Sequence, residues 1–123
     1  MQLGDYLERI GFRGQARPDL ATLRALVAAQ ISTVPFENLD VQLGVRLGTS
    51  PEAAWDKIVR QGRGGWCYEC NAVLGSALAM IGFPVRRVAC GVLRAEGTTE
   101  AIGGHLALIA ECEGVEWLVD AGF

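Results

Sequence analysis

The pattern of apolar residues changes at Gly82-Phe83-Pro84, and this change limits the folds that the chain can adopt. Before it, apolar residues recur at the three- and four-residue spacing of amphipathic helices; after it, they fall into short strand-like runs. Glycine followed closely by proline is a typical helix stop. Because helices precede strands instead of alternating with them, the sequence predicts an α+β fold and not a series of β-α-β units.

Apolar spacing and capping residues predict four helices in the first two thirds of the chain. In the second helix, Leu20, Leu23, Val27 and Ile31 form the apolar stripe. Residues 38–48, between the second and third helices, are expected to form a loop with short extended pieces. The predicted helices span residues 3–10, 18–34, 50–62 and 66–81.

Three strands are expected after Pro84, with Glu113-Gly114 as the turn of a hairpin. Residues 94–103 are polar and contain glycine, so we expect a loop there. We therefore divide the chain into a helical domain, residues 1–83, and a β-domain, residues 84–123. The predicted strands span residues 85–93, 105–112 and 115–119.

Composition and charge exclude several classes of function. The chain has 123 residues, half of them hydrophobic, with 11 Lys+Arg against 14 Asp+Glu and a net charge of −3. Such a charge disfavours nucleic-acid binding. No uncharged run suits a membrane span, and the first ten residues lack the apolar segment of a secretory signal. We therefore expect a cytoplasmic protein whose four cysteines are mostly reduced.

The segment Arg63–Glu69, with the sequence RGGWCYE, is the most informative about function. Gly64 and Gly65 permit a sharp turn and a close backbone approach, and they place Cys67 at the start of the fourth predicted helix. The N–H groups and the positive dipole at a helix start favour a thiolate, which is the nucleophilic form of cysteine. The alternative is that Cys67 is a small buried side chain of an apolar helix.

His105 is the only histidine of the chain, and the predicted hairpin brings it near Asp120. A turn at Glu113-Gly114 pairs Ala107 with Asp120, so His105 is a diagonal neighbour on the same face, within about 7–8 Å. A carboxylate there would fix the imidazole tautomer and stabilise the imidazolium. The predicted site therefore has Cys67 as nucleophile, His105 as base and Asp120 as orienting group. The alternative, if each residue is considered alone, is that His105 is an ordinary strand histidine and Asp120 a turn-forming aspartate.

Two other functions fit part of the cysteine pattern. Trp66–Cys70 has the W-C-x-x-C form of thioredoxin-like redox proteins, although in those proteins the motif follows a strand. A structural zinc site would need a second closely spaced pair of ligands, so we expect no metal. Its ligands would be drawn from Cys67, Cys70, Cys90, Cys112 and His105.

Four segments together resemble the arylamine N-acetyltransferase family. They are PFENLD at residues 35–40, RGGWCYE at residues 63–69, the strand that contains His105, and VDAGF at residues 119–123. The spacing also fits the family, with 38 residues from Cys67 to His105 and another 15 to Asp120.

The resemblance implies a two-step, ping-pong transfer by a cytoplasmic enzyme of xenobiotic metabolism. Cys67 would take an acetyl group from acetyl-CoA as a thioester, and an arylamine, arylhydrazine or arylhydroxylamine would remove it. His105 and Asp120 match the base and the orienting carboxylate, and Phe36 and Phe123 match residues that line the acceptor pocket. The motif positions that support the site are Arg63, Gly64, Gly65 and Glu69.

The fold that the resemblance implies is a helical bundle followed by an antiparallel β-barrel and a lid, with a cysteine-protease-like Cys-His-Asp arrangement. Family members are more than twice as long, so this sequence supplies the bundle and only the first strands of the barrel. A catalytically weak or inactive remnant is therefore an alternative function. A sister activity, such as an amide synthase or a thiol hydrolase, is another. Three strands with an open edge also predict self-association.

Overall fold

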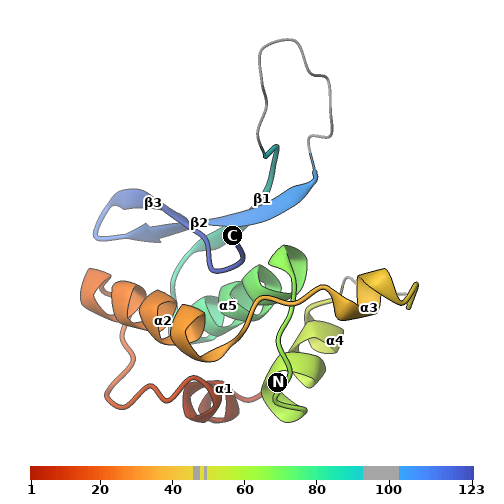
Figure 1. Cartoon of the computed structure of the whole chain (residues 1–123). Coiled ribbons are helices and arrows are strands. Elements are labelled where there is room, and N and C mark those ends of the chain that lie inside the picture. The colour runs from red at the N-terminus through yellow and green to blue at the C-terminus, as the bar shows by residue number, and fades with distance from the viewer. Residues whose placement is uncertain (46–47, 49, 93–102) are drawn as a thin grey trace.

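A computed structural model describes residues 1–45, 48, 50–92 and 103–123 (Figure 1). It has a three-stranded sheet above a layer of helices, which is the α+β fold that the sequence predicts. The elements are α1 (Leu3–Arg9), α2 (Leu20–Thr33), α3 (Leu39–Gln42), α4 (Pro51–Trp55), a π-helical segment η1 (Asp56–Arg60), α5 (Cys67–Ile81), β1 (Val85–Cys90), β2 (His105–Cys112) and β3 (Val115–Val119).

The helix boundaries follow the capping residues of the sequence. The Asp19 carboxylate accepts a hydrogen bond from the backbone of Thr22 and begins α2, and the Ser50 hydroxyl does the same for α4, with Pro51 at the first helical position. Gly82 ends α5 in the left-handed conformation, at φ +110°. The third predicted helix is present as α4 continued by η1.

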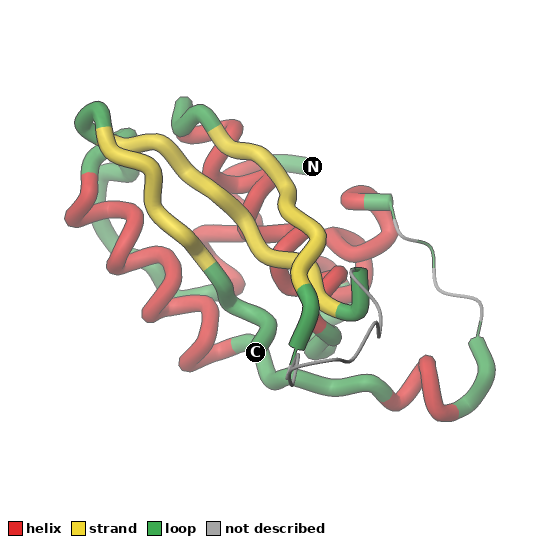
Figure 2. The backbone as a smooth tube through the Cα atoms, turned by 90° about the horizontal axis from the view of Figure 1, so that it is seen from above, coloured by secondary structure: helices red, strands yellow, loops and turns green. Residues whose placement is uncertain are grey.

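Helix α5 lies beneath the sheet and is the centre of the core (Figures 1 and 2). Leu74 and Leu78 of α5 and Leu108 of β2 are fully buried. Gly75 permits this close packing, because a Cβ atom at Gly75 would lie 3.2 Å from Leu108 Cδ2. One hydrophobic core therefore joins the helices to the sheet.

The sheet is antiparallel in the order β1-β2-β3. In the β2–β3 hairpin, Cys112 pairs with Val115 and Leu108 pairs with Val119, which is the predicted register. Glu113 and Gly114 both have positive φ, at 54° and 77°, as a two-residue hairpin turn of type I′ requires. Strand β1 ends at Cys90, earlier than predicted, and residue 93 lies outside the described residues.

The prediction of a loop with extended pieces at residues 38–48 was wrong, because Leu39–Gln42 form α3. The Glu37 carboxylate accepts a hydrogen bond from the backbone of Leu39, 3.0 Å away, and so caps the new helix. Residues 46, 47 and 49, which include most of the second predicted extended piece, lie outside the described residues.

The predicted stripe of α2 was also partly wrong. Ile31 is 59% exposed, whereas Leu26 and Gln30 are fully buried. A buried amide needs hydrogen-bond partners, and Gln30 has two of them. It accepts from the Tyr6 hydroxyl at 2.7 Å and donates to the carbonyl of Cys70 at 3.0 Å. The buried face of α2 therefore includes Gln30, whose long-range hydrogen bonds satisfy its amide, and it leaves Ile31 exposed.

Candidate active site

Cys67 is the first residue of α5, as predicted, and the glycine turn before it fits closely against another segment. A side chain at Gly64 would overlap the carbonyl oxygen of Pro35, and one at Gly65 would lie 2.9 Å from the Ile58 side chain. Phe36 and Gly65 form a parallel β-bridge. The turn therefore holds the segment around Phe36 beside Cys67.

His105 and Asp120 meet at the open end of the hairpin, as its register predicts. The distance from His105 Nε2 to Asp120 Oδ2 is 2.6 Å, and His105 is only 6% exposed. An ionised carboxylate only accepts hydrogen bonds, so Nε2 carries the proton in this pair. This tautomer leaves Nδ1 as the basic nitrogen of the ring.

The carboxylate of Asp120 has donors on both oxygens. Besides His105 on Oδ2, the side chain of Asn71 donates to Oδ1 at 2.8 Å and the backbone of Gly122 donates at 2.9 Å. Burial would raise the pKa of Asp120, but these donors and His105 together lower it below its usual value. Asp120 is therefore ionised at neutral pH.

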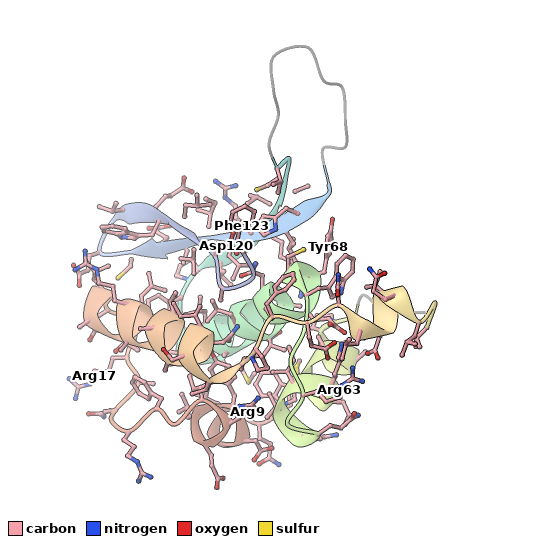
Figure 3. The ribbon with its side chains drawn as sticks, viewed as in Figure 1. Arg9, Arg17, Arg63, Tyr68, Asp120 and Phe123 are labelled. Carbon is pink, nitrogen blue, oxygen red and sulfur yellow. The ribbon has the colours of Figure 1, made fainter. Side chains whose placement is uncertain are left out.

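Cys67 and His105 line the same apolar hollow, which has a volume of about 410 Å³. Gly122 lies against Cys67, because a Cβ atom at Gly122 would be 2.6 Å from Cys67 Cα. The Phe123 ring meets His105 edge to face, with centroids 5.3 Å apart. Figure 3 shows Asp120 and Phe123 together on the segment that follows β3. The hollow is lined by Phe36, Trp66, Cys67, Val92, Gly104, His105, Gly122 and Phe123.

A second contact joins the start of α5 to the start of β2. The Tyr68 hydroxyl donates a hydrogen bond to the carbonyl of Gly103, two residues before His105. Its ring stacks at a tilt on Trp66, with centroids 5.0 Å apart. Tyr68 therefore helps to hold the helix of Cys67 beside the strand of His105 (Figure 3).

Two basic and three acidic side chains form an ion cluster next to the glycine turn. Lys57 Nζ lies 2.9 Å from Glu69, 3.0 Å from Asp40 and 3.4 Å from Glu37. Arg63 Nη2 lies 2.8 Å from Glu37 and 2.9 Å from Asp40. The hydrogen bonds from Arg63 and Lys57 lower the pKa of Asp40. Burial would lower the pKa of Lys57, but its bonds to Glu69 and Asp40 raise it.

This cluster contains two of the predicted supporting residues, Arg63 and Glu69. Glu69 is 5% exposed, and its carboxylate also accepts a hydrogen bond from the backbone of Trp66 at 3.2 Å, which caps α5. Arg63 holds the acidic residues of the segment that carries Phe36. Glu69 thus contacts the start of the helix that carries Cys67, and Arg63 contacts the segment that follows Phe36.

Several residues of the site were not predicted from the sequence, among them Lys57, Asn71 and Gly122. Lys57 is a charged residue that is 8% exposed, beside Trp55 and Ile58, which are also buried. Asn71 is an amide in a mostly apolar helix, four residues after Cys67. In hindsight both were polar residues on apolar faces, and such residues need partners.

Neither alternative function of the cysteines gains support. The Cys70 thiol donates to the carbonyl of Gly65 at 3.2 Å, and burial, with the charges of Glu69 and Cys67, raises its pKa to about 12. The motif follows η1 and a turn, not a strand. In the part of the chain that the structure describes, His, Cys, Asp and Glu form no group of three or more that could hold a metal ion.

The family model described as N-acetyltransferase matches residues 19–123, which is most of the chain. Among the N-acetyltransferases, the relatives with similar sequences are arylamine N-acetyltransferases. The arylamine N-acetyltransferase of Mycolicibacterium smegmatis is 44% identical over 128 residues, covering 100% of this chain and 46% of that protein. Arylamine N-acetyltransferase 1 of Homo sapiens is 38% identical over 125 residues, covering 100% and 43%.

A solved structure with a similar fold comes from the same family as these relatives. The arylamine N-acetyltransferase of Mycobacterium marinum in complex with CoA matches with a TM-score of 0.89 at 40% identity, covering 98% of this chain and 46% of that one. The chain thus belongs to the arylamine N-acetyltransferase family. It spans about half the length of the curated relatives that it matches.

No helix among the described residues has the length and hydropathy needed to cross a membrane.

Proposed function

We propose that this chain carries the acetyl-transfer site of a cytoplasmic enzyme of xenobiotic metabolism, which moves an acetyl group from acetyl-CoA to an aromatic amine or hydrazine. The observation that carries the proposal is the hydrogen bond of 2.6 Å between Asp120 and His105, together with the position of His105 in the same hollow as a cysteine at a helix start. A cysteine nucleophile, a base and a group that orients the base are the three parts that acyl transfer through a thioester needs.

In the first step, the Cys67 thiolate attacks the carbonyl carbon of acetyl-CoA while His105 is protonated. The tetrahedral intermediate collapses by breaking the bond from carbon to the CoA sulfur. The imidazolium gives its proton to that sulfur, so that CoA leaves as a thiol and Cys67 holds the acetyl group as a thioester. Asp120 stabilises the imidazolium before the proton leaves.

In the second step, the amine nitrogen of the acceptor attacks the thioester carbon. Neutral His105 takes one proton from that nitrogen, and the bond from carbon to Cys67 sulfur breaks. The products are the N-acetylated acceptor and a Cys67 thiolate beside a protonated imidazole, which is the starting state. The two steps together make a ping-pong cycle.

The negative oxygen of each tetrahedral intermediate requires hydrogen-bond donors. We propose that the backbone N–H of Cys67 is one of them, since the first N–H groups of a helix have no partner within that helix. The positive end of the α5 dipole would add to this stabilisation.

The walls of the hollow fit an aromatic acceptor. Phe36 and Phe123 line it, and both are exposed, at 58% and 89%. Aromatic rings prefer edge-to-face or offset contacts with other rings, which these two side chains can offer. We therefore propose that both contact the acceptor, while acetyl-CoA is the acyl donor, in line with the CoA complex of the Mycobacterium marinum relative.

We also propose that the boundary at Pro84 separates two domains, residues 1–83 with the nucleophile and residues 84–123 with the base and the carboxylate. The order of the elements supports this division, because every described helix precedes every described strand. The active site would then lie where the two domains meet, and their shared core would fix its geometry.

The test is intact-mass analysis after incubation with acetyl-CoA, followed by addition of an arylamine. The proposal predicts one acetyl adduct, which the arylamine removes as its N-acetyl derivative. The adduct should be absent in Cys67→Ala and present in Cys70→Ala, the matched control for a neighbouring thiol. A well-folded chain without an adduct would favour the inactive remnant. An adduct from another acyl thioester but not from acetyl-CoA would favour a sister activity.

A further inference from the structure

Asn71 is a fully buried amide on the same face of α5 as the nucleophile. It lies four residues after Cys67, so the two side chains are neighbours on one side of the helix. Its exposed fraction is 0%. Burying an amide costs free energy unless hydrogen bonds replace those to water. The partners of Asn71 therefore show what the residue holds in place.

All the partners of Asn71 belong to the segments that carry the other two residues of the site. Its Nδ2 atom donates to the carbonyl of Leu106, next to His105, at 2.6 Å, and to Asp120 Oδ1 at 2.8 Å. Its Oδ1 atom accepts from the backbone of Ala121, next to Asp120, at 2.9 Å. One side chain thus uses both amide hydrogens and its oxygen to join α5, β2 and the segment after β3.

We propose that Asn71 is the positioning residue of the site, which turns the Asp120 carboxylate so that its other oxygen meets His105. The proposal rests on the proposed function. Asp120 follows Val119, the last paired residue of β3, so the sheet ladder does not fix it. The donors Asn71 and Gly122 fix Oδ1, and Oδ2 is then left for the imidazole.

The electrostatics agree with this role. Burial would raise the pKa of Asp120, and the hydrogen bond from Asn71 is the largest of the contributions that instead lower it. A hydrogen bond to an ionised group is about twice as strong as one between neutral groups. Asn71 therefore keeps Asp120 charged as well as oriented, and a charged Asp120 stabilises the imidazolium that accompanies the Cys67 thiolate.

The test is the rate at which iodoacetamide alkylates Cys67 as a function of pH, followed by peptide mapping. In Asn71→Ala and Asn71→Ser, the half-maximal rate should move to higher pH, and the rate on the acid side should fall about tenfold. The matched control is Gln30→Ala, because Gln30 is the other fully buried amide that donates to a backbone carbonyl, that of Cys70. Its variant should lose thermal stability without moving the pH profile.

Asp120→Asn separates the failure of this inference from the failure of the proposed function. If Asp120→Asn leaves the alkylation profile of the wild-type chain unchanged, the triad itself is wrong. If Asp120→Asn moves the profile but the Asn71 variants behave like Gln30→Ala, the triad stands and the role of Asn71 is refuted.

A second measurement needs no change at Asn71, so it remains decisive if the Asn71 variants do not fold. It compares hydrogen exchange of the Asn71 side-chain amide, by NMR, between the wild-type chain and Asp120→Asn. The proposal predicts slow exchange in the wild-type chain and exchange about tenfold faster in Asp120→Asn. Equal exchange rates would overturn it.

Discussion

Two glycines allow other segments to pack closely around Cys67. Gly65 lets the turn before α5 approach Ile58 and Glu69, and Gly122 lets the segment after β3 pack against Cys67. A Cβ atom at either place would come within 3 Å of a neighbour, which is closer than carbon atoms pack. The position of the sulfur therefore depends on glycines that are 57 residues apart in the sequence.

Replacing Gly122 by alanine tests this dependence. The new methyl group would lie 2.6 Å from Cys67 Cα, so either Cys67 or the Asp120 segment must move. A displacement of about 1 Å at a reacting group costs about 100-fold in rate. We expect Gly122→Ala to lose about that much in the rate of acetyl adduct formation. Gly4→Ala, at a helical position with open space around it, should keep the wild-type rate.

The sequence predicted that His105 and Asp120 lie near each other, because a two-residue turn sets the register of the hairpin up to Leu108 and Val119, the last pair before Asp120. Once Glu113 and Gly114 are identified as the turn, the register of every pair in the hairpin follows. Asn71 could not be placed in the same way. Its role depends on which distant segment covers that face of α5, and no local pattern encodes this contact.

The ion cluster links three elements that are separate in the sequence. Lys57 comes from η1, Glu69 from the first turn of α5, and Glu37 and Asp40 from the segment at α3. This dependence also explains why α3 was predicted as a loop. A four-residue helix is too short to be stable by itself, so its charged long-range partners decide its conformation.

Removal of Lys57 should therefore destabilise the fold. Lys57→Met leaves the buried carboxylate of Glu69 without its cation, while Arg63 still pairs with Glu37 and Asp40. An unpaired buried charge costs about 3–5 kcal/mol in the free energy of unfolding. Urea denaturation would measure the loss. The control is Arg86→Ala, which removes an exposed pair with Glu116 and should cost about 0–1 kcal/mol. Equal losses in the two variants would show that the cluster is not a structural link.

The whole molecule should be most stable between about pH 5 and 9. Glu37, Asp40 and Asp120 have pKa values below their usual 4.5, 3.8 and 3.8. For Glu37, burial opposes the shift, and the hydrogen bond from Leu39 and the cations Lys57 and Arg63 outweigh it. Such groups stabilise the fold above their unfolded pKa, and this contribution is lost as the pH falls through their folded values.

On the alkaline side, Cys70 and Lys57 have raised pKa values, and their contributions are lost as the pH rises. For Cys70, the loss should begin near pH 9, its usual pKa, and continue to about 12. Thermal unfolding measured across this pH range checks the loss of stability on both the acid and the alkaline side. Cys70→Ala should reduce the loss of stability that begins near pH 9. A stability maximum outside the window would contradict the assignment of these groups.

Strand β3 lies at the edge of the described sheet and exposes apolar side chains. Among the described residues, β3 is an edge strand, and Leu118 and Val115 on it are 70% and 50% exposed. Figure 2 shows this strand beside α2, and an apolar hollow of about 440 Å³ lies between them. An exposed apolar edge favours pairing with another strand. We propose that copies of this chain pair through β3.

Size-exclusion chromatography with light scattering tests this proposal. The wild-type chain should show dimers or larger species as its concentration rises, and Leu118→Lys should shift the population to monomer. Leu43→Lys is the control, since Leu43 is 77% exposed but lies next to α3. A wild-type chain that stays monomeric at high concentration would refute the pairing.

The proposed mechanism requires that His105, oriented by Asp120, activates Cys67 for acylation. Peptide mapping after a short exposure to acetyl-CoA at neutral pH shows which residue is acylated. We expect an acetyl group on Cys67 in the wild-type chain, and its loss in folded His105→Gln. Acetylation at another residue, or equal acetylation of Cys67 in His105→Gln, would contradict it.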